Sequence, residues 1–353
     1  MTTNQEIILS ASDVEVQFTV RGKQLRAIRN ISIDLYKDET LAIVGESGSG
    51  KSVFTKTFTG MLESNGRVTN GTAMFEGKDL YANKTDADWE AIRGKKIATI
   101  FQDPMTSLNP IIPIGKQITE VIEKHQGKSF AEAKEEAIKL MEEVGIYNAE
   151  GRFDEYPFMY SGGMRQRIVI AIALAANPDI LICDEPTTAL DVTIQSQILE
   201  LINKLKRERN LSVIFITHDL GVVANMADRV AVMYAGKIVE YGTAEEIFYS
   251  AAHPYTWALL SSMPDLDTNE KLEAIPGTPP NMIYPPKGDA FAPRNKYAMK
   301  IDFERQPPMF KITDTHFAAT WLLHPDAPHV DPPKTVLDRI ARMKAKRENS
   351  NAE

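Results

Sequence analysis

Four short runs of hydrophobic residues stand out in the first two thirds of the chain, and longer segments of mixed polarity separate them. Such runs are typical of strands that are buried on both faces, as in a parallel sheet whose strands are joined by helices. A further stretch, residues 229–242, has the pattern of a hairpin that turns at Ala235 and Gly236. The pattern therefore predicts an α/β fold. The four runs are residues 41–45, 97–101, 179–183 and 212–217.

Between the second and third runs the apolar positions take on helical spacing. Ser129 and Glu132 have the spacing of a capping box, and Gly145 follows the last periodic position, so a helix is expected between them. We expect residues 104–160 to form a helical insertion into the α/β core. The spacing of apolar positions in residues 193–209 predicts one more helix. The apolar positions on its predicted inner face are Ile194, Ile198, Ile202 and Leu205.

The C-terminal third differs from the rest of the chain in composition and periodicity. Residues 251–335 are rich in proline and glycine and have little periodicity, which predicts an irregular extension packed on the domain of residues 1–250. Residues 336–353 carry many charges, and we expect a flexible tail there.

Composition narrows the class of protein. The net charge is -8, from 40 basic and 48 acidic residues, which argues against a nucleic-acid binder. The single cysteine, Cys183, excludes a disulfide framework and fits a reducing compartment. The N-terminus lacks the features of a signal peptide, and Asn177, Pro178 and Asp179 interrupt the most apolar run. These features predict a soluble protein that can still sit on a membrane partner.

The strongest chemical motif is GESGSGKS, residues 45–52, here called the phosphate loop. It matches the pattern G-x-x-x-x-G-K-[ST] and follows a predicted strand, which favours nucleotide binding over an ordinary glycine-serine turn. Backbone N–H groups of such a loop surround phosphates, Lys51 supplies a positive charge, and the Ser52 hydroxyl is a ligand for Mg²⁺. The predicted phosphate-binding residues are Gly45, Ser47, Gly48, Ser49, Gly50, Lys51, Ser52 and Val53.

Polar residues that suit phosphate chemistry end three other predicted strands. Asp184 is expected to complete the Mg²⁺ shell through water, and Glu185 to polarise the attacking water as a general base. Gln102 is placed to contact both Mg²⁺ and that water, and His218 to contact the γ-phosphate. Taken singly, Asp184 and Glu185 are also consistent with an acidic turn. Gln102 is also consistent with a surface amide, and His218 with a structural histidine. Ligands of open α/β sheets bind at strand ends, so their common position favours a nucleotide site.

A second candidate anion site is YSGGMRQR, residues 160–167. A serine and two glycines precede an apolar run, which is the pattern of a helix N-terminus that binds an anion. A chain with a phosphate loop has no evident need for this second site.

The order of these motifs resembles that of ATP-binding-cassette (ABC) ATPases over roughly residues 8–243. The resemblance implies a P-loop core, an antiparallel β edge subdomain and a helical subdomain. It also implies that the serine-glycine-glycine turn is a signature motif, which contacts ATP held by a partner cassette, and that Asp191 couples the two sites. The signature face would then comprise Ser161, Gly162, Gly163, Gln166 and Asp191.

Three further segments look like the ATPases of oligopeptide and dipeptide importers, and they extend the resemblance to about residue 325. They are FQDPMTSLNP, HPYTWALLSSMPD and IPGTPP. The resemblance implies a peripheral subunit on the cytoplasmic face of the cell membrane that powers oligopeptide uptake. Its implied partners are a second, homologous ATPase subunit, two transmembrane permease subunits and an extracytoplasmic peptide-binding protein. Import of dipeptides, nickel or another small solute stays open, as does the choice between a homodimer and a heterodimer of cassettes.

Other classes fit less well. A soluble cassette ATPase of DNA repair or translation usually has a coiled-coil insertion or two cassettes in one chain. A P-loop kinase has no use for the signature turn or for His218. A degenerate cassette is disfavoured because Lys51, Asp184, Glu185 and His218 are all intact.

The sequence departs from the family at two places. Many members hold an iron–sulfur cluster with four cysteines in the extension, but this chain has other residues there, so no cluster is predicted. An aromatic residue that stacks on adenine is common before the phosphate loop; Phe18 is the aromatic candidate here and Arg21 the alternative. The residues at the expected cysteine positions are Asp289, Asn295, Asp302 and Thr320.

Overall fold

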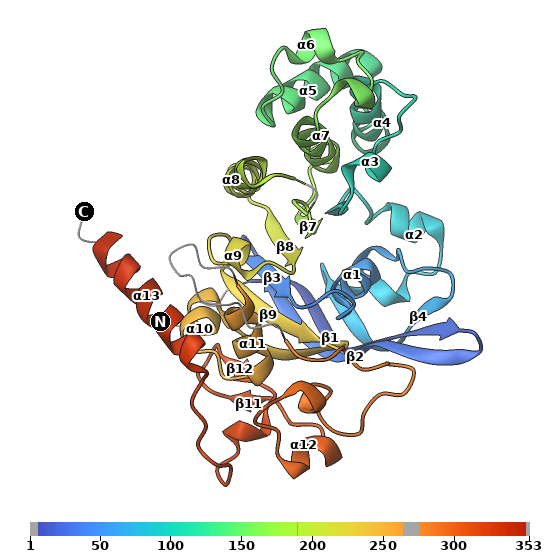
Figure 1. Ribbon diagram of the computed structural model, residues 1–353. Coiled ribbons are helices and arrows are strands. Elements are labelled where there is room, and N and C mark those ends of the chain that lie inside the picture. The colour runs from blue at the N-terminus through green and yellow to red at the C-terminus, as the bar shows by residue number, and fades with distance from the viewer. Residues whose placement is uncertain (1–5, 189, 264–274, 351–353) are drawn as a thin grey trace.

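Two β-sheets organise the described part of the chain, and a group of helices projects away from them (Figure 1). The computed structural model describes residues 6–188, 190–263 and 275–350, with the backbone alone at residues 105, 343 and 345–350. The larger sheet has the strand order β11-β12-β10-β9-β3-β8-β7-β6, and the smaller sheet has the order β2-β1-β4-β5.

The centre of the larger sheet is parallel, as the hydrophobic runs predict. Strands β6, β7, β8, β3 and β9 pair in parallel, and every residue of β3 and β8 is buried. The predicted hairpin is confirmed, because β10 pairs antiparallel with β9 around Ala235 and Gly236. The bounds are β3 Thr40–Val44, β6 Ile97–Ile100, β7 Ile180–Asp184, β8 Ser212–Thr217, β9 Arg229–Tyr234 and β10 Lys237–Thr243.

The smaller sheet is antiparallel and covers one face of the larger one. Two long strands, β1 and β2, pair along most of their length, and β4 pairs with the other edge of β1. Side chains from both sheets share one hydrophobic core, in which Val16, Ile31, Ile43 and Ile182 are almost completely buried. The bounds are β1 Ile7–Val20, β2 Lys23–Tyr36, β4 Gly66–Phe75 and β5 Lys78–Asp79.

Most of residues 104–160 lie in short and medium helices, and their hydrophobic core is shared with α8 and one face of the sheet. The capping box before α5 is present, with the Ser129 N–H donating to Glu132 Oε2 at 2.9 Å. In α8, Ile198, Ile202 and Leu205 are buried, as expected. The bounds are α3 Pro104–Ser107, α4 Ile114–Gln126, α5 Phe130–Glu143, α6 Ala149–Arg152, η3 Pro157–Met159, α7 Gly162–Leu174 and α8 Val192–Arg209.

The C-terminal extension is joined to the larger sheet, which its irregular sequence does not reveal. Strand β12 pairs antiparallel with β10, and β11 pairs with β12. The buried Glu240 side chain of β10 accepts the His253 N–H at 3.1 Å and lies 2.8 Å from His316 Nε2. One strand residue therefore holds two distant parts of the extension. The bounds are α11 Pro254–Ser262, η4 Ala292–Arg294, α12 Lys300–Glu304, β11 Phe310–Lys311, β12 Phe317–Ala318 and η5 Trp321–Leu323.

The end of the chain differs from its prediction. A helix, α13 (Lys334–Ser350), occupies most of the segment expected to be a flexible tail, whose residues 351–353 lie outside the described ones. Val336 is 1% exposed and Ile340 packs against the same cluster, so an apolar pair at i and i+4 anchors the helix. The many charges obscured this short pattern.

The remaining short elements connect these layers. None of the helices in the described ranges is long and apolar enough to cross a membrane. The bounds are α1 Lys51–Lys56, η1 Thr57–Thr59, η2 Leu80–Ala82, α2 Asp86–Glu90, α9 Leu220–Val223 and α10 Ala244–Tyr249.

Candidate nucleotide site

The phosphate loop connects β3 to α1 and depends on glycine at two positions. A Cβ on Gly45 would lie 2.1 Å from the Met233 carbonyl oxygen, so any side chain would push the loop off the sheet. Gly50 is the N-cap of α1 and has φ +104°, a conformation that other residues rarely adopt. The two glycines let the backbone turn tightly between strand and helix.

Lys51 lies within the curve of this loop. The residue is 5% exposed, and Nζ donates to the carbonyl oxygens of Gly45 at 2.7 Å and Glu46 at 3.1 Å. Burial lowers the pKa of the ammonium, and nearby carboxylates, that of Glu185 foremost, oppose this shift. A buried cation among carbonyl groups is well placed to bind phosphate oxygens.

Ser52 and Asp184 meet beside Lys51. The Ser52 hydroxyl donates to Asp184 Oδ1 at 2.9 Å. Burial raises the pKa of the Asp184 carboxyl, while the hydrogen bond from Ser52 lowers it. A hydroxyl and a carboxylate in contact present the oxygen ligands that Mg²⁺ prefers, so this pair fits the metal that the sequence predicts.

The backbone at Glu185 explains how two consecutive acidic residues serve one site. Glu185 has φ +48°, in the left-handed region, directly after the last residue of β7. Side chains on a regular strand alternate between faces, and this turn breaks the alternation. A left-handed residue other than glycine costs about 1–2 kcal/mol, and such strain is concentrated at functional sites.

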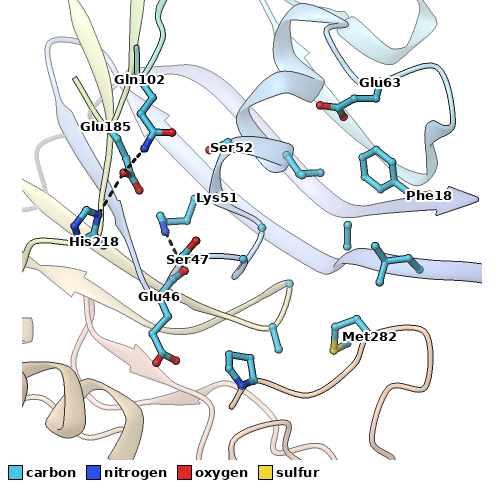
Figure 2. A pocket seen from close by; sticks show the side chains of 18 of the residues that line it. Phe18, Glu46, Ser47, Lys51, Ser52, Glu63, Gln102, Glu185, His218 and Met282 are labelled. Atoms are coloured by element: carbon cyan, nitrogen blue, oxygen red, sulfur yellow. Dashed lines mark hydrogen bonds and ion pairs between the residues drawn. The ribbon is translucent and has the colours of Figure 1, made fainter. Parts of the chain in front are cut away.

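Glu185 is the centre of a small polar network (Figure 2). Its Oε2 accepts hydrogen bonds from Gln102 Nε2 at 3.1 Å and Thr188 Oγ at 3.0 Å, and His218 Nδ1 lies 3.3 Å away. The structure thus brings together Gln102, Glu185 and His218 from the ends of three strands. Thr188 is a neighbour that the sequence analysis missed; its position three residues after Glu185, in a turn, was the available signal.

These groups line one cavity of about 1190 Å³ that also has an apolar end. Phe18, Val20, Leu25 and Ala27 of the smaller sheet form part of that end, and residues of the C-terminal extension face it. Phe18 lines the cavity, as Figure 2 shows, whereas Arg21 lies in the exposed β1–β2 turn and is not part of the lining. The lining residues from the extension are Leu259, Ser262, Ile275, Pro279 and Met282.

The predicted signature turn is not part of this cavity. Ser161 caps α7 by accepting the Met164 N–H at 3.3 Å, and both Ser161 and Gly162 are exposed. A Cβ on Gly163 would lie 2.7 Å from Ile194 Cγ2, which places the turn against the first turn of α8.

Asp191 lies at the start of that same helix. It is exposed and caps α8 by accepting the Ile194 N–H at 3.0 Å, so it joins the signature turn at one exposed edge. Gln166, predicted to bind nucleotide with them, is instead 0% exposed inside the molecule. Its place in α7, one turn beyond Ser161, points it toward the core.

The four positions at which the family resemblance predicts cysteines carry oxygen acceptors that cap turns. Asp289, Asn295 and Thr320 each accept the backbone N–H two residues ahead, at 3.1, 2.9 and 3.3 Å. Asp302 accepts the Met299 N–H at 2.7 Å. These hydrogen bonds hold the local turns of the extension. No group of three or more His, Cys, Asp or Glu side chains suited to a metal occurs among the residues described.

Comparison with known proteins agrees with this geometry. The ABC transporter family model matches residues 28–188, and the model of the oligopeptide/dipeptide transporter C-terminal region matches residues 239–301. The chain is 62% identical to the oligopeptide transport ATP-binding protein AmiE of Streptococcus pneumoniae over 98% of both chains. It is 57% identical to the oligopeptide transport ATP-binding protein OppD of Bacillus subtilis, over 95% of this chain and 94% of that one.

A solved structure of an ATP-binding cassette, MJ0796, is similar in fold. That protein is a dimer in a post-hydrolysis state with ADP and Pi; it is 26% identical, with a TM-score of 0.60. The similarity covers 67% of this chain and 98% of the cassette. The chain therefore belongs to the ABC transporter family, among its oligopeptide and dipeptide transport ATP-binding proteins.

Proposed function

We propose that this chain hydrolyses ATP in the cavity around the phosphate loop to power uptake of oligopeptides through a membrane importer. Its family makes the chain an ATPase of peptide transport. The observation that carries the assignment of the site is that Lys51 and Glu185, from distant segments, line one cavity. Beside it, Asp184 accepts the hydrogen bond of the lining residue Ser52. Residues 1–250 would form the ATPase domain and residues 251–335 an importer-type extension.

The phosphates of ATP would bind at the phosphate loop, and the adenine would bind at the apolar end of the cavity. Lys51 would exchange its carbonyl partners for phosphate oxygens, and the N–H groups of residues 45–53 would surround them. Phe18 and Met282 would contact the adenine from the smaller sheet and from the extension. These contacts orient the γ-phosphate toward the strand ends.

Ser52, Asp184 and Gln102 would hold Mg²⁺, with Asp184 acting through water. The ion, when bound, neutralises charge on the phosphate oxygens. The raised pKa of Asp184 fits a carboxyl that a nearby cation would keep ionised.

Glu185 would orient the attacking water and accept its proton. Gln102, Thr188 and His218 all contact its Oε2 and so fix the direction of the carboxylate. His218 is half-exposed in the cavity wall, and its ring would reach the γ-phosphate. Preorganised hydrogen bonds of this kind account for much of the rate in phosphoryl transfer.

The exposed signature turn supports a dimer of cassettes. Ser161, Gly162 and Gly163 would contact ATP held by a partner, because they lie outside this chain's own cavity. ATP would close the dimer, and loss of the γ-phosphate would open it. Asp191, at the same edge, would couple the two sites.

The transporter would contain a homologous second ATPase subunit, two permease subunits and an extracytoplasmic peptide-binding protein. This chain would then lie on the cytoplasmic face of the membrane. The names of the relatives support oligopeptides as cargo. Dipeptides are the second candidate, because the matching C-terminal family model covers transporters of both.

The direct test replaces Glu185 with Gln. We expect ATP turnover of the reconstituted transporter to fall by about 10²–10⁴-fold, since the general base is lost, while ATP binding persists. Glu200→Gln, an exposed acid on α8, is the matched control and should leave turnover unchanged. Unchanged turnover in Glu185→Gln would place hydrolysis elsewhere. Competition of labelled oligopeptide uptake by unlabelled dipeptides would identify the cargo.

A further inference from the structure

An ion pair joins the C-terminal extension to the phosphate loop. Arg294, at the end of η4, donates from Nη1 to Glu46 Oε2 at 2.6 Å and from Nη2 to Glu46 Oε1 at 2.9 Å. Glu46 is the second residue of the loop, 248 positions earlier in the chain. A bidentate pair fixes both the position and the direction of the carboxylate.

Arg294 is itself held rigidly. Its guanidinium is nearly inaccessible, and it also donates to the Pro276 carbonyl at 2.7 Å and the Tyr234 hydroxyl at 3.1 Å. The backbone of Glu46 has a second contact, since its N–H donates to the Tyr255 hydroxyl at 2.8 Å. Two separate parts of the extension, η4 and α11, therefore hold the side chain and the backbone of one loop residue.

Glu46 is linked directly to the phosphate-binding lysine. Its carbonyl accepts from Lys51 Nζ at 3.1 Å, and its carboxylate is among the charges that act on that ammonium. Glu46 is also one of the residues that line the nucleotide cavity, and Figure 2 shows its side chain directed away from Lys51. An uncompensated carboxylate there would repel triphosphate and compete for Lys51, and the guanidinium of Arg294 supplies the compensating charge.

We propose that Arg294 is a positioning residue for ATP, which neutralises Glu46 and thereby holds the phosphate loop open to triphosphate. The C-terminal extension is then a part of the nucleotide site as well as a packing element. This inference rests on the proposed function, because it places ATP at the phosphate loop.

The test is a double-mutant cycle on the full chain, with binding of Mg·ATP measured by calorimetry at low and high salt. Arg294→Met leaves Glu46 uncompensated, and we expect ATP affinity to fall by about tenfold at low salt. Glu46→Gln removes the repelling charge, so the double variant Glu46→Gln/Arg294→Met should recover most of that loss. The loss in Arg294→Met should also shrink at high salt, because salt screens a charge that borders solvent.

Two controls separate this role from a general loss of structure. Arg305→Met removes an exposed arginine of the same extension and should bind ATP like the wild type. Arg294→Lys keeps the charge without the bidentate geometry, so its ATP affinity should lie between those of the wild type and Arg294→Met. The lysine variant also remains available for the test if the Arg294→Met chain does not fold. Wild-type affinity in Arg294→Lys and Arg294→Met, or no recovery in the double variant, overturns the inference. A wild-type chain that does not bind ATP overturns the proposed function itself.

Discussion

The phosphate loop and the signature turn are both glycine-rich turns at helix starts, yet their surroundings differ. The phosphate loop is enclosed: Lys51 is buried, Ser52 contacts Asp184, and Glu46 is held by Arg294. In the signature turn, Ser161 caps its own helix and faces outward. The same local motif is thus enclosed by other parts of the chain in one place and exposed in the other.

The difference has a physical consequence for function. A triphosphate needs several donors and cations around it, and the enclosed loop offers them within one chain. The exposed turn offers backbone N–H groups and a hydroxyl without a counterpart in this chain's own cavity. The comparison favours a role for the turn across a dimer, in which each cassette completes the other's site.

The largest expected effect on ATP binding is at the enclosed turn. Lys51→Ala removes the buried ammonium, and we expect Mg·ATP affinity of the isolated chain to fall on the order of 100-fold, because charged hydrogen bonds to phosphate are lost. Lys37→Ala, at an exposed pair with Glu6, is the control and should bind normally. Equilibrium titration with ATP measures both. Retained affinity in Lys51→Ala would show that the loop is not the phosphate site.

A smaller effect is expected at the exposed turn, and in a different assay. Gly162→Asp places an anion where the partner's γ-phosphate would lie, and a Cβ there meets only Leu190 at 3.9 Å, so α7 should fold normally. We expect ATP-driven association of cassettes to weaken by about tenfold, while ATP affinity of the isolated chain is unchanged.

Gly162→Asn is the matched variant, since it has the same size without the charge. Association measured by analytical ultracentrifugation in a hydrolysis-deficient Glu185→Gln background should be closer to normal for Gly162→Asn than for Gly162→Asp. Equal effects of the two variants would mean that size rather than charge matters. Weakened ATP binding by the isolated Gly162→Asp chain would contradict the division into two half-sites.

The smallest effect is expected at the apolar end of the enclosed site. Phe18→Leu keeps a hydrophobic side chain but removes the aromatic face, so ATP affinity should fall about threefold with little change for inorganic triphosphate. Arg21→Ala should have no effect, because that side chain does not line the cavity. Parallel titrations with ATP and triphosphate give the comparison. A larger loss in Arg21→Ala would reverse the assignment of the base contact.

Local patterns were sufficient for much of the fold. The runs that became β3, β7 and β8 are continuous and apolar, and the helix after Ser129 begins with a capping box. These signals depend on residues a few positions apart. The pairing of β12 with β10 joins segments about eighty residues apart through two short strands, and no local periodicity marks it.

The sequence by itself determined the phosphate loop, its lysine and the acidic residues at the end of β7, because each is a short motif with a fixed spacing. Tertiary structure alone decided three other features. It turned Glu185 toward Gln102 and His218, buried Gln166, and brought Arg294 to Glu46. These depend on one backbone angle, on the orientation of a helix in the core, and on contacts between residues far apart in the chain. No spacing along a sequence encodes those directly.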